Sequence, residues 1–584
     1  MRNIKYKILF GVFVLLTAFG CEDVLNTEAK DAFAEDLIYS DPSQVEKLVF
    51  TAYNSTEAWS LNRYQWWSRR FNLEGASFEA KFNFQDLDVY RDRAGWTPSN
   101  VGVLTEKWRN YWDYVRLTNE FLDRIDASGA MQADPDETAV LKAEMKFLRA
   151  NLYAKLIKFY GGVPIMDHAL GLTEEFNLPR NSYEECVDFI VRELDEAAEV
   201  LPLTRPDSEF GRATKLSALA VKSRTLLYAA SKLHDPAFAP SNDPLYVYTK
   251  STKWQDASDA AKAVIDLVDA RDLIAVANAD AYQKMFLSPN QDILFARSYG
   301  SSYYDFGTDA NSLPDQCMSP NGYGGWALSS PTHNFTLQFN MADGTGTNGD
   351  GSTFDAANPN TGREMRYYAN LLYNGAQFRG RDVQYYLSEN PTVNPHGYDS
   401  PNGLGNAQHS SKTGYNIRKF QDESIGTWDP EKKTYNTLTN ISPNRPYVLY
   451  RLAEIYLNYA EAEYNLGGAT HENNAREFVS KVSTRALQPA ITATGEELLE
   501  AIKRERRVEL CFEGHSFFDE RRWMEEDHLG FDIKGLKWTK KGDGSLAFEE
   551  YKVVTRPWWD KHYYLPIPAS EVEKAPALVQ NFGY

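Results

Sequence analysis

Residues 134–164 read DPDETAVLKAEMKFLRANLYAKLIKFYGGVP, and this stretch decides the fold. It opens with Asp134 as a candidate N-cap, a proline at the first helical position, and Glu137 where a capping box would close. It ends at Gly161 and Gly162 with a proline just beyond, and both signals stop a helix. The stretch therefore predicts one long helix between the DPDE string and the glycine pair.

The same kind of pattern recurs along the chain. Ser182 with Glu185, and Thr494 with Glu497, have the spacing of capping boxes. Apolar residues at helical spacing predict three further helices. These are Ser217–Lys232, Trp254–Val268 and Leu449–Leu466. A chain built in this way is expected to fold mainly into paired antiparallel helices.

The pattern changes between about Asn278 and Tyr447. Gly, Asn, Asp, Ser and Pro dominate there, aromatic residues are scattered among them, and helical periodicity is nearly lost. Long irregular segments inside a domain are uncommon and usually functional. The alternative is a disordered insertion, but tyrosines and a tryptophan are not typical of disorder. We therefore expect ordered loops that bind a ligand.

The first 20 residues, MRNIKYKILFGVFVLLTAFG, have the features of a bacterial secretory signal: three basic residues, an apolar run and small residues at the end. The apolar run is shorter than the roughly 20 residues of an ordinary membrane-spanning helix. Gly20 followed by Cys21 is the cleavage pattern of a lipoprotein, and a signal peptide with an incidental cysteine is the alternative. We expect residues 1–20 to be removed and Cys21 to be acylated, which would tether the protein to a membrane that it does not span.

Charge and cysteine content narrow the class of protein. The 584 residues carry 62 Lys and Arg against 81 Asp and Glu, a net charge of −19. Nucleic acid would repel such a chain, so a nucleic-acid partner is not expected. Beyond Cys21 three cysteines remain, an odd number that argues against a disulfide framework. Cys186 lies on the apolar stripe of its predicted helix and is expected to be a buried, inert thiol.

Five strings together resemble one known family. They are FLRANLYAKLIKFYGGVPIM at 147–166, GRATKLSALAVKSRTLLYAASKLHDP at 211–236, YRLAEIYLNYAEA at 450–462, RERRVELCFEGHSFFDERRW at 504–523 and YYLPIPASEVEKAPALVQNFGY at 563–584. In this order they resemble the SusD/RagB family of outer-membrane lipoproteins, which capture nutrients, mostly glycans, for Bacteroidetes-type bacteria. Two positions depart from the family pattern, Ser516 after the Gly-His pair and Phe582 in place of a proline, and both lie in structural motifs.

The resemblance implies a mainly α fold, in which tetratricopeptide-like helix pairs form a scaffold and long irregular loop insertions form the ligand face. After the signal peptide at 1–20, residues 21–584 would form a single SusD-like domain. The scaffold would occupy about 36–275 and 448–525, and the loop-rich, ligand-binding insertion about 276–447. The resemblance also implies a lipid-anchored outer-membrane protein that faces the cell exterior and delivers oligosaccharides, without catalysis, to a SusC-like TonB-dependent barrel.

The string RERRVELCFEGHSFFDERRW offers a candidate for an enzyme. Glu505 and Glu509 share a face of the predicted helix with apolar residues. The acid and base of a glycoside hydrolase need two carboxyl groups about 5 to 9.5 Å apart across a sugar site. The alternative pairs them with arginines such as Arg451, Arg521 or Arg522, because buried carboxylates are costly unless paired. We favour the structural network, since the sequence carries no HExxH, CxxC, GxSxG or P-loop string.

The loop from Asp343 to Asp355, DGTGTNGDGSTFD, is rich in oxygen ligands. It fails the spacing of an EF-hand, which needs a glycine at the sixth position and acids at the first, third and twelfth. We therefore expect a solvated cluster of turns there, with a calcium site as the alternative, and no other metal or cofactor.

Aromatic residues carry the positive signal for binding. They make up 14% of the chain, and six of its thirteen tryptophans lie between positions 59 and 112. Sugar rings stack on flat aromatic faces while polar groups take the hydroxyls, and we take each ring to contribute on the order of 1 kcal/mol, by analogy with aromatic pairs. Trp108 and Trp112 stand at helical spacing and are expected in the core.

Eight residues are the candidates for the ligand site. Trp96 lies in the loop RAGWTPSN, which in the family supplies an aromatic platform and polar contacts, so Trp96 and Asn100 are the first pair. The others stand in two further aromatic-rich segments: Trp66, Trp67, Tyr303, Tyr304, Tyr323 and Trp326. The resulting hypothesis is a non-catalytic, cell-surface glycan-binding lipoprotein. A glycoside hydrolase, and a helical-repeat scaffold that binds a protein, are the two alternatives.

Overall fold

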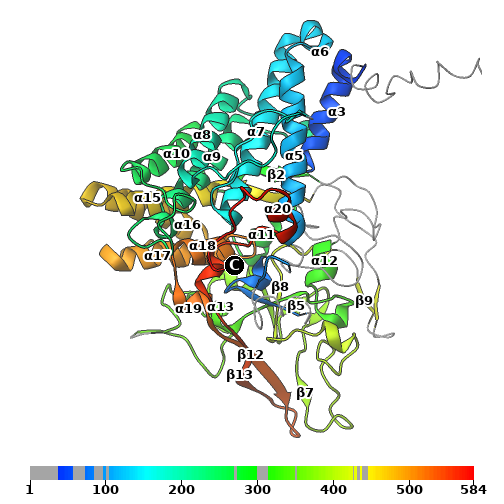
Figure 1. Ribbon diagram of the computed structural model, residues 1–584. Helices are drawn as coiled ribbons and strands as arrows, with labels where there is room; N and C mark the ends of the chain where they lie inside the picture. Colours follow the sequence, from blue (N-terminus) through cyan, green and yellow to red (C-terminus); the bar gives the residue numbers. More distant parts are fainter. Residues whose placement is uncertain are drawn as a thin grey trace, which may run out of the picture.

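The computed structural model of the protein describes residues 37–56, 73–83, 96–99, 104–171, 173–268, 272–298, 313–348, 351–424, 427–429, 434–436 and 445–584. Figure 1 shows the longer helices stacked side by side in the upper part of the view, and a part with short helices and strands below them. Within these ranges, no helix combines the length and the apolar character that crossing a membrane requires.

The upper part consists of helices of 12 to 26 residues. They are α3 (Pro42–Tyr53), α5 (Leu104–Ile125), α7 (Pro135–Tyr160), α8 (Tyr183–Val200), α9 (Lys215–Ala230), α10 (Lys253–Leu267), α15 (Leu452–Leu466), α16 (Ala469–Arg485) and α17 (Gly495–Glu509). Consecutive members pack against each other, from α7 with α8 to α15 with α16. Helix α15 packs against α10 although a long loop-rich segment separates them in the sequence. The stack is therefore continuous in space and forms the predicted helical scaffold.

Helix α7 is the stretch that decides the fold, and it begins and ends at the predicted residues, although its predicted capping box is not formed. Asp134 accepts a hydrogen bond from the backbone N–H of Glu137 at 3.1 Å, which caps the first turn. The predicted capping box is not completed, because the backbone N–H of Asp134 donates to the carbonyl of Ala130 at 3.0 Å; the Glu137 carboxylate lies 4.0 Å from Arg212. At the other end Gly161 adopts φ +75°, and a Cβ there would lie 2.7 Å from the carbonyl oxygen of Leu245. Only glycine fits this end of the helix.

The other predicted caps have mixed outcomes. Ser182 and Glu185 form a capping box, with bonds of 3.1 and 2.8 Å in the two directions. The box predicted for Thr494 and Glu497 is wrong, because the Thr494 side chain makes no cap hydrogen bond. The Ser/Thr-x-x-Glu spacing is necessary for a capping box but not sufficient. The N-cap side chain must also point towards the backbone N–H groups of the first helical turn.

One predicted helix begins later than expected. The pattern favoured a start at Leu449, whereas α15 begins at Leu452. Residues Tyr447–Arg451 form strand β11, which pairs antiparallel with β2 (Ile293–Arg297). The apolar residues of this segment fit a buried strand as well as a helix, and the pairing with β2 decides between them.

The lower part contains short elements with many turns between them. They are α11 (Ala279–Lys284), α12 (Leu313–Met318), η5 (Asn321–Tyr323), β3 (Ser329–Pro331), α13 (His333–Thr336), α14 (Met365–Asn370), β4 (Leu371–Tyr373), β7 (Leu387–Ser388), η6 (Ala407–His409) and β8 (Tyr415–Ile417). Strand β1 (Ala80–Phe82), from the N-terminal part of the chain, joins them by pairing with β3. Several of these elements contribute aromatic and aliphatic side chains to a second hydrophobic core.

A long hairpin near the C-terminus was not predicted. Its strands β12 (Phe531–Lys540) and β13 (Leu546–Arg556) point away from the helices (Figure 1), and β12 also pairs with β7. Trp538 packs against Phe548 across the two strands, with 4.9 Å between ring centroids. Alternating apolar and polar residues around the turn KGDG are the sequence signal that would have found this hairpin.

Two predictions about the core are confirmed. Cys186 is fully buried on α8, and burial raises the pKa of its thiol to about 12, so it is inert. Trp108 is 3% exposed, and Trp112 is partly buried and packs against the same core. The two indole rings make an edge-to-face contact with 5.6 Å between their centroids.

A buried carboxyl group holds the start of β1. Glu79 is 1% exposed; one carboxyl oxygen accepts a hydrogen bond from the backbone N–H of Phe512 at 3.2 Å, and the other has no hydrogen-bond partner. Burial, followed by the nearby negative charge of Glu74, raises the pKa of Glu79 well above its ordinary value of 4.5. The folded protein therefore retains a proton there that the unfolded chain releases as the pH rises.

This difference predicts a pH-dependent effect of Glu79→Gln. Since the pKa is higher in the folded state, the stability of the wild type falls as the pH rises above about 4.5 and through the folded pKa. Glutamine keeps an acceptor for Phe512 and does not titrate. We expect the variant to unfold at a higher temperature than wild type at pH 8, with the advantage shrinking towards pH 5. Thermal unfolding at both pH values checks this, with the exposed Glu549→Gln as control; an equal offset at both would contradict it.

Candidate ligand-binding face

The structure describes three of the eight candidate ligand residues, namely Trp96, Tyr323 and Trp326. The other candidates lie outside the described residues, as does the lipid site: Trp66, Trp67, Asn100, Tyr303, Tyr304 and Cys21. The roles predicted for these six positions stay predictions, and the three described residues occupy different surroundings.

Trp96 is buried, which differs from the prediction. Its side chain is 2% exposed and belongs to the main core. The ring packs against the imidazole of His562, with 5.1 Å between centroids, and the Arg521 guanidinium lies 6.0 Å from its centroid. The cause is the C-terminal segment, which also reaches this loop through a bond from Ala569 N–H to the carbonyl of Pro98. A buried ring has no free face for a sugar, so Trp96 is not kept as a candidate.

Tyr323 is also interior, at 3% exposed. Its hydroxyl donates to the carbonyl oxygens of Phe378 at 2.9 Å and Arg381 at 3.1 Å. The Arg381 guanidinium lies 3.7 Å from the centre of its ring. A tyrosine in a glycine-rich loop was expected to face outward, but its hydroxyl and ring are both used inside the protein. Tyr323 therefore supports the loop and presents no surface to a ligand.

Trp326 keeps part of its surface exposed. Its indole packs on a small cluster formed by Phe82, Leu328 and Cys317. The ring of His409 lies 6.2 Å away at an angle of 55°. A partly exposed indole offers apolar surface on which a sugar ring can stack. Trp326 is therefore the described candidate that fits the predicted role, and we call its surroundings the Trp326 face, made of β1, β3, η5, η6 and the loop of Trp326.

Hydrogen bonds of one asparagine tie the segments of the Trp326 face together. Asn83 follows β1 and donates its backbone N–H to the carbonyl of Leu328 at 2.8 Å. Its side-chain amide donates to the carbonyls of Ala327 and Ser410. Its amide oxygen accepts from the hydroxyl of Ser330 at 2.9 Å. The end of β1, the residues that follow Trp326 and the segment after η6 are thus connected through a buried polar group, which holds the backbone next to Trp326.

Buried ion pairs also connect the loops of this region. Asp315 accepts from Arg379 at 2.7 Å and from Arg445 at 2.6 Å. Arg381 makes two bonds to Asp399, of 2.7 and 2.9 Å. Buried acids paired in this way are strongly held, because removal of one partner leaves an uncompensated charge. These pairs explain how a segment rich in glycine and asparagine holds one conformation.

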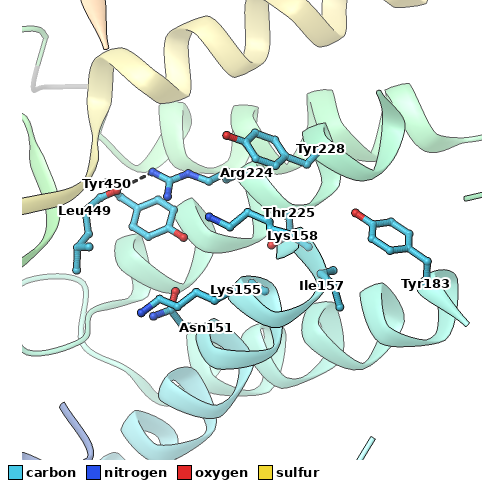
Figure 2. Close-up of a pocket in the computed structure, with 11 residues that line it drawn as sticks. Asn151, Lys155, Ile157, Lys158, Tyr183, Arg224, Thr225, Tyr228, Leu449 and Tyr450 are labelled. Carbon is cyan, nitrogen blue, oxygen red and sulfur yellow. Dashed lines mark hydrogen bonds between the residues drawn. The ribbon is translucent and has the colours of Figure 1, made fainter. Parts of the chain in front are cut away.

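A cavity in the helical scaffold is too small for a sugar. It lies between α7, α8, α9 and β11, and its walls include Lys155, Lys158, Arg224 and Tyr450 (Figure 2). Its volume of about 20 Å³ has room for one water molecule. Arg224 is held there by Glu454 through two bonds of 2.6 Å and stacks on Tyr450 at 3.6 Å. This cavity belongs to the packing of the scaffold.

The carboxylate pair of α17 is part of a buried network of arginines. Glu509 is fully buried and contacts Arg451 at 2.6 Å, Arg366 at 3.1 Å, and Arg485. Glu505 contacts Arg366 at 2.5 Å. Burial alone would raise the pKa of Glu509, but the guanidinium groups outweigh burial and lower it, whereas burial raises the pKa of Glu505. A hydrolase needs sugar between the two carboxyl groups, and here one guanidinium bridges them.

The structural interpretation of these carboxylates is therefore confirmed, with one correction. Arg451 is a partner as predicted, but Arg521 and Arg522 pair instead with Glu520 and Glu461. In the residues that the structure describes, no group of three or more His, Cys, Asp or Glu side chains could hold a metal ion. In the loop considered as a calcium site, the Asp343 carboxylate accepts hydrogen bonds from the hydroxyl groups of Thr345 and Thr353.

Sequence reasoning missed two parts of the Trp326 face. His409 was not a candidate, and a single histidine in the segment GNAQHSSKTG gives no signal for an aromatic contact. The link between Asn83 and Ser330 was missed because it joins residues 247 positions apart. The short run AKF before Asn83 indicates a strand only weakly.

Profiles of known families match two parts of the chain. The sequence profile of the SusD family matches residues 291–584, and a profile described as "Starch-binding associating with outer membrane" matches residues 33–227. Starch-binding protein SusD of Bacteroides thetaiotaomicron is 25% identical over 514 residues, which cover 84% of this chain and 80% of that protein. A SusD-like protein of Formosa agariphila is 23% identical over 606 residues, 99% of both chains.

Solved structures share the fold. A SusD-like protein of Bacteroides fragilis superposes with a TM-score of 0.75 at 27% identity, over 95% of this chain and 99% of that one. A laminarin-binding SusD-like protein superposes with a TM-score of 0.61 at 17% identity, over 93% and 99% of the two chains. The mainly α, tetratricopeptide-like scaffold predicted from the sequence is confirmed. The relative from Bacteroides thetaiotaomicron is named as a starch-binding protein and not as a hydrolase, in agreement with the predicted absence of catalysis. The chain belongs to the SusD family.

Proposed function

We propose that this protein binds oligosaccharides without catalysis on the Trp326 face and delivers them to a SusC-like TonB-dependent barrel. The observation that carries the proposal is a partly exposed indole, fixed by buried hydrogen bonds and ion pairs, in a chain of the SusD family. The relative from Bacteroides thetaiotaomicron is named a starch-binding protein, and one structural neighbour is named laminarin-binding. Both names support a carbohydrate as the ligand.

The chemistry of the face suits a sugar. The Trp326 ring offers an apolar surface, and the exposed side chains of Asn406 and Gln408 lie on the segment that ends at His409. Stacking on one ring contributes on the order of 1 kcal/mol, and amides supply donors and acceptors for hydroxyl groups. A dissociation constant of roughly 1 µM to 1 mM would follow from a few such contacts. Weak binding suffices when a tether keeps the protein close to its partner.

The anchor and the partner belong to the same proposal. Residues 1–20 would be removed and Cys21 acylated, so that residues 21–584 stay on the outer membrane as one domain facing the cell exterior. The profile description that mentions association with the outer membrane supports this location. Fractionation of cells and co-purification from detergent-solubilised outer membrane test both parts. We expect a barrel to co-purify with the wild type, and recovery of the wild type in the soluble fraction would contradict the anchor.

Calorimetry with a panel of plant, host and microbial oligosaccharides tests the capture of glycans. We expect saturable binding to at least one of them, with no new reducing ends after prolonged incubation. Absence of binding across the panel would contradict capture, and steady release of reducing ends would favour the hydrolase. The two outcomes are separate, because binding and cleavage are measured on the same sample.

A further inference from the structure

Strand β13 forms one edge of a three-stranded sheet. The strand order is β13–β12–β7, so β12 covers one side of β13, and among the residues that the structure describes no strand pairs with its other side. The strand is 11 residues long and contains no proline. Figure 1 shows the hairpin extending away from the long helices. An exposed edge of this length offers its backbone groups to a further strand.

The outer edge of β12 identifies the backbone groups that face outward on β13. Lys534 and Leu536 donate their backbone N–H groups away from β13, to loop residues at 2.9 and 2.8 Å. In a non-hydrogen-bonded pair of an antiparallel ladder, the two opposed residues both turn their backbone groups away from each other. Lys552 lies opposite Lys534, and Glu550 lies opposite Leu536. The backbone groups of Glu550 and Lys552 therefore face the open edge.

These two residues carry opposite charges at that edge. Within the described part of the chain, their outward backbone groups form no hydrogen bond. Their side chains are 43% and 55% exposed, and they pair on the hairpin with Lys534 at 2.8 Å and with Asp532 at 2.9 Å. Lys534 and Lys552 are directly opposed in the register, and like charges in that position are destabilising. An acidic side chain beside Lys552 on the open side would complement them.

We propose that the open edge of β13 pairs with β13 of a second copy of this chain. The two strands run antiparallel about a two-fold axis at Tyr551. In this register Glu550 of each copy lies opposite Lys552 of the other, and each opposed pair exchanges both backbone hydrogen bonds. The edge is thus complementary to itself in charge and in hydrogen bonding, which favours a second copy as its occupant. The inference goes beyond glycan capture and does not depend on it.

Charge selects this register over its neighbours. A slip of two residues places Glu550 opposite Glu550 of the other copy in one direction, and Lys552 opposite Lys552 in the other. Both arrangements oppose like charges, which destabilises the pair. A slip of one residue sets outward-facing backbone groups opposite inward-facing ones, so the hydrogen bonds are lost. Because the contact is small, we expect a weak dimer with a dissociation constant of roughly 10 to 100 µM.

Sedimentation velocity and a charge swap test this proposal. The purified protein is measured from about 1 to about 300 µM, and we expect a monomer–dimer equilibrium. Glu550→Lys and Lys552→Glu each oppose like charges at the axis, so each should raise the dissociation constant at least about tenfold. An equimolar mixture of the two variants should associate within about threefold of the wild type, because each variant supplies the charges that the other lacks.

A neighbouring residue provides the matched control. Glu549→Lys makes the same change of charge on the same strand, but the residue opposite it across the axis is Val553. Its dissociation constant should stay within about twofold of the wild type. Circular dichroism shows that each variant is folded, and Glu550→Gln, which adds no positive charge, should still weaken association at least about threefold.

Three results would overturn the proposal. The first is a wild type that stays monomeric at every concentration. The second is a mixture of folded Glu550→Lys and Lys552→Glu that does not associate. The third is association that Glu549→Lys weakens and Glu550→Lys does not, because that would place the contact in another register. Glycan binding is measured separately, so each of these results leaves the proposed capture of glycans intact.

Discussion

Glu509→Gln is expected to destabilise the protein by about 3 to 5 kcal/mol, the usual cost of removing one partner from a buried ion pair. The Glu509 carboxylate is fully buried and contacts three guanidinium groups, those of Arg366, Arg451 and Arg485. Arg366 and Arg451 have further acidic partners, Glu505 and Glu513 among them, but the network would lose one negative charge without losing a positive one. Equilibrium unfolding in denaturant measures the change.

The same helix offers a matched control. Glu500 lies on α17 with a side chain that is 64% exposed, and it pairs with Lys503 at 3.1 Å. Glu500→Gln should change stability by less than about 0.5 kcal/mol, because exposed ion pairs contribute little. The wild type should also lose the contribution of Glu509 in acid. Its pKa is lowered in the folded state, so this stability is present above about pH 4.5 and decreases as the pH falls.

Comparison of these variants shows whether Glu509 has a structural or a catalytic role. If Glu509 were a catalytic carboxylate in an accessible site, Glu509→Gln would fold with near wild-type stability and lose activity on a polysaccharide. Equal unfolding free energies for Glu509→Gln and Glu500→Gln would therefore contradict the structural role. We expect a clear separation between them, with no cleavage of polysaccharide by the wild type.

The helical scaffold could be predicted from the sequence because its signals are local. The proline after Asp134, the glycine pair at Gly161 and the Ser182–Glu185 box all act within one turn of a helix. The β12–β13 hairpin could also have been predicted, because its alternating apolar and polar residues and its glycine-containing turn are local signals.

The ligand site could be predicted only in part, because burial depends on residues far apart in the sequence. Trp96 between a glycine and a proline was expected to lie on an exposed loop, but His562, 466 positions away, covers it. Likewise, the contact between Arg366 and Glu509 joins residues 143 positions apart. Composition indicates a loop-rich region that contains Trp326, which is partly exposed, but it does not say which aromatic rings the rest of the chain encloses.

Trp326→Ala is expected to weaken glycan binding at least about tenfold, or 1.4 kcal/mol. The substitution removes the stacking contact with the sugar, typically about 0.5 to 1.5 kcal/mol, together with the apolar area that the sugar would cover. The folded state should change little, because part of the indole is exposed and the segment is held by the Asn83 hydrogen bonds and the Asp315 ion pairs. Trp326→Phe retains a ring and should lose less affinity than the alanine variant.

A second exposed indole provides the control. Trp559 is 41% exposed and lies in the C-terminal segment against His562, 5.2 Å between ring centroids. Trp559→Ala removes an exposed tryptophan that is not part of the Trp326 face, so the affinity for the glycan should stay within twofold of the wild type. A loss of affinity for Trp559→Ala, with no change for Trp326→Ala, would place the site near the C-terminal segment.

Capture of a glycan on the Trp326 face is the central claim, and one titration tests it most directly. The oligosaccharide that binds best in the panel is titrated by calorimetry into the wild type and into Trp326→Ala, at matched concentrations and with both proteins shown to be folded. We predict saturable binding to the wild type and a dissociation constant at least about tenfold higher for the variant. Equal dissociation constants for the two folded proteins would contradict the claim.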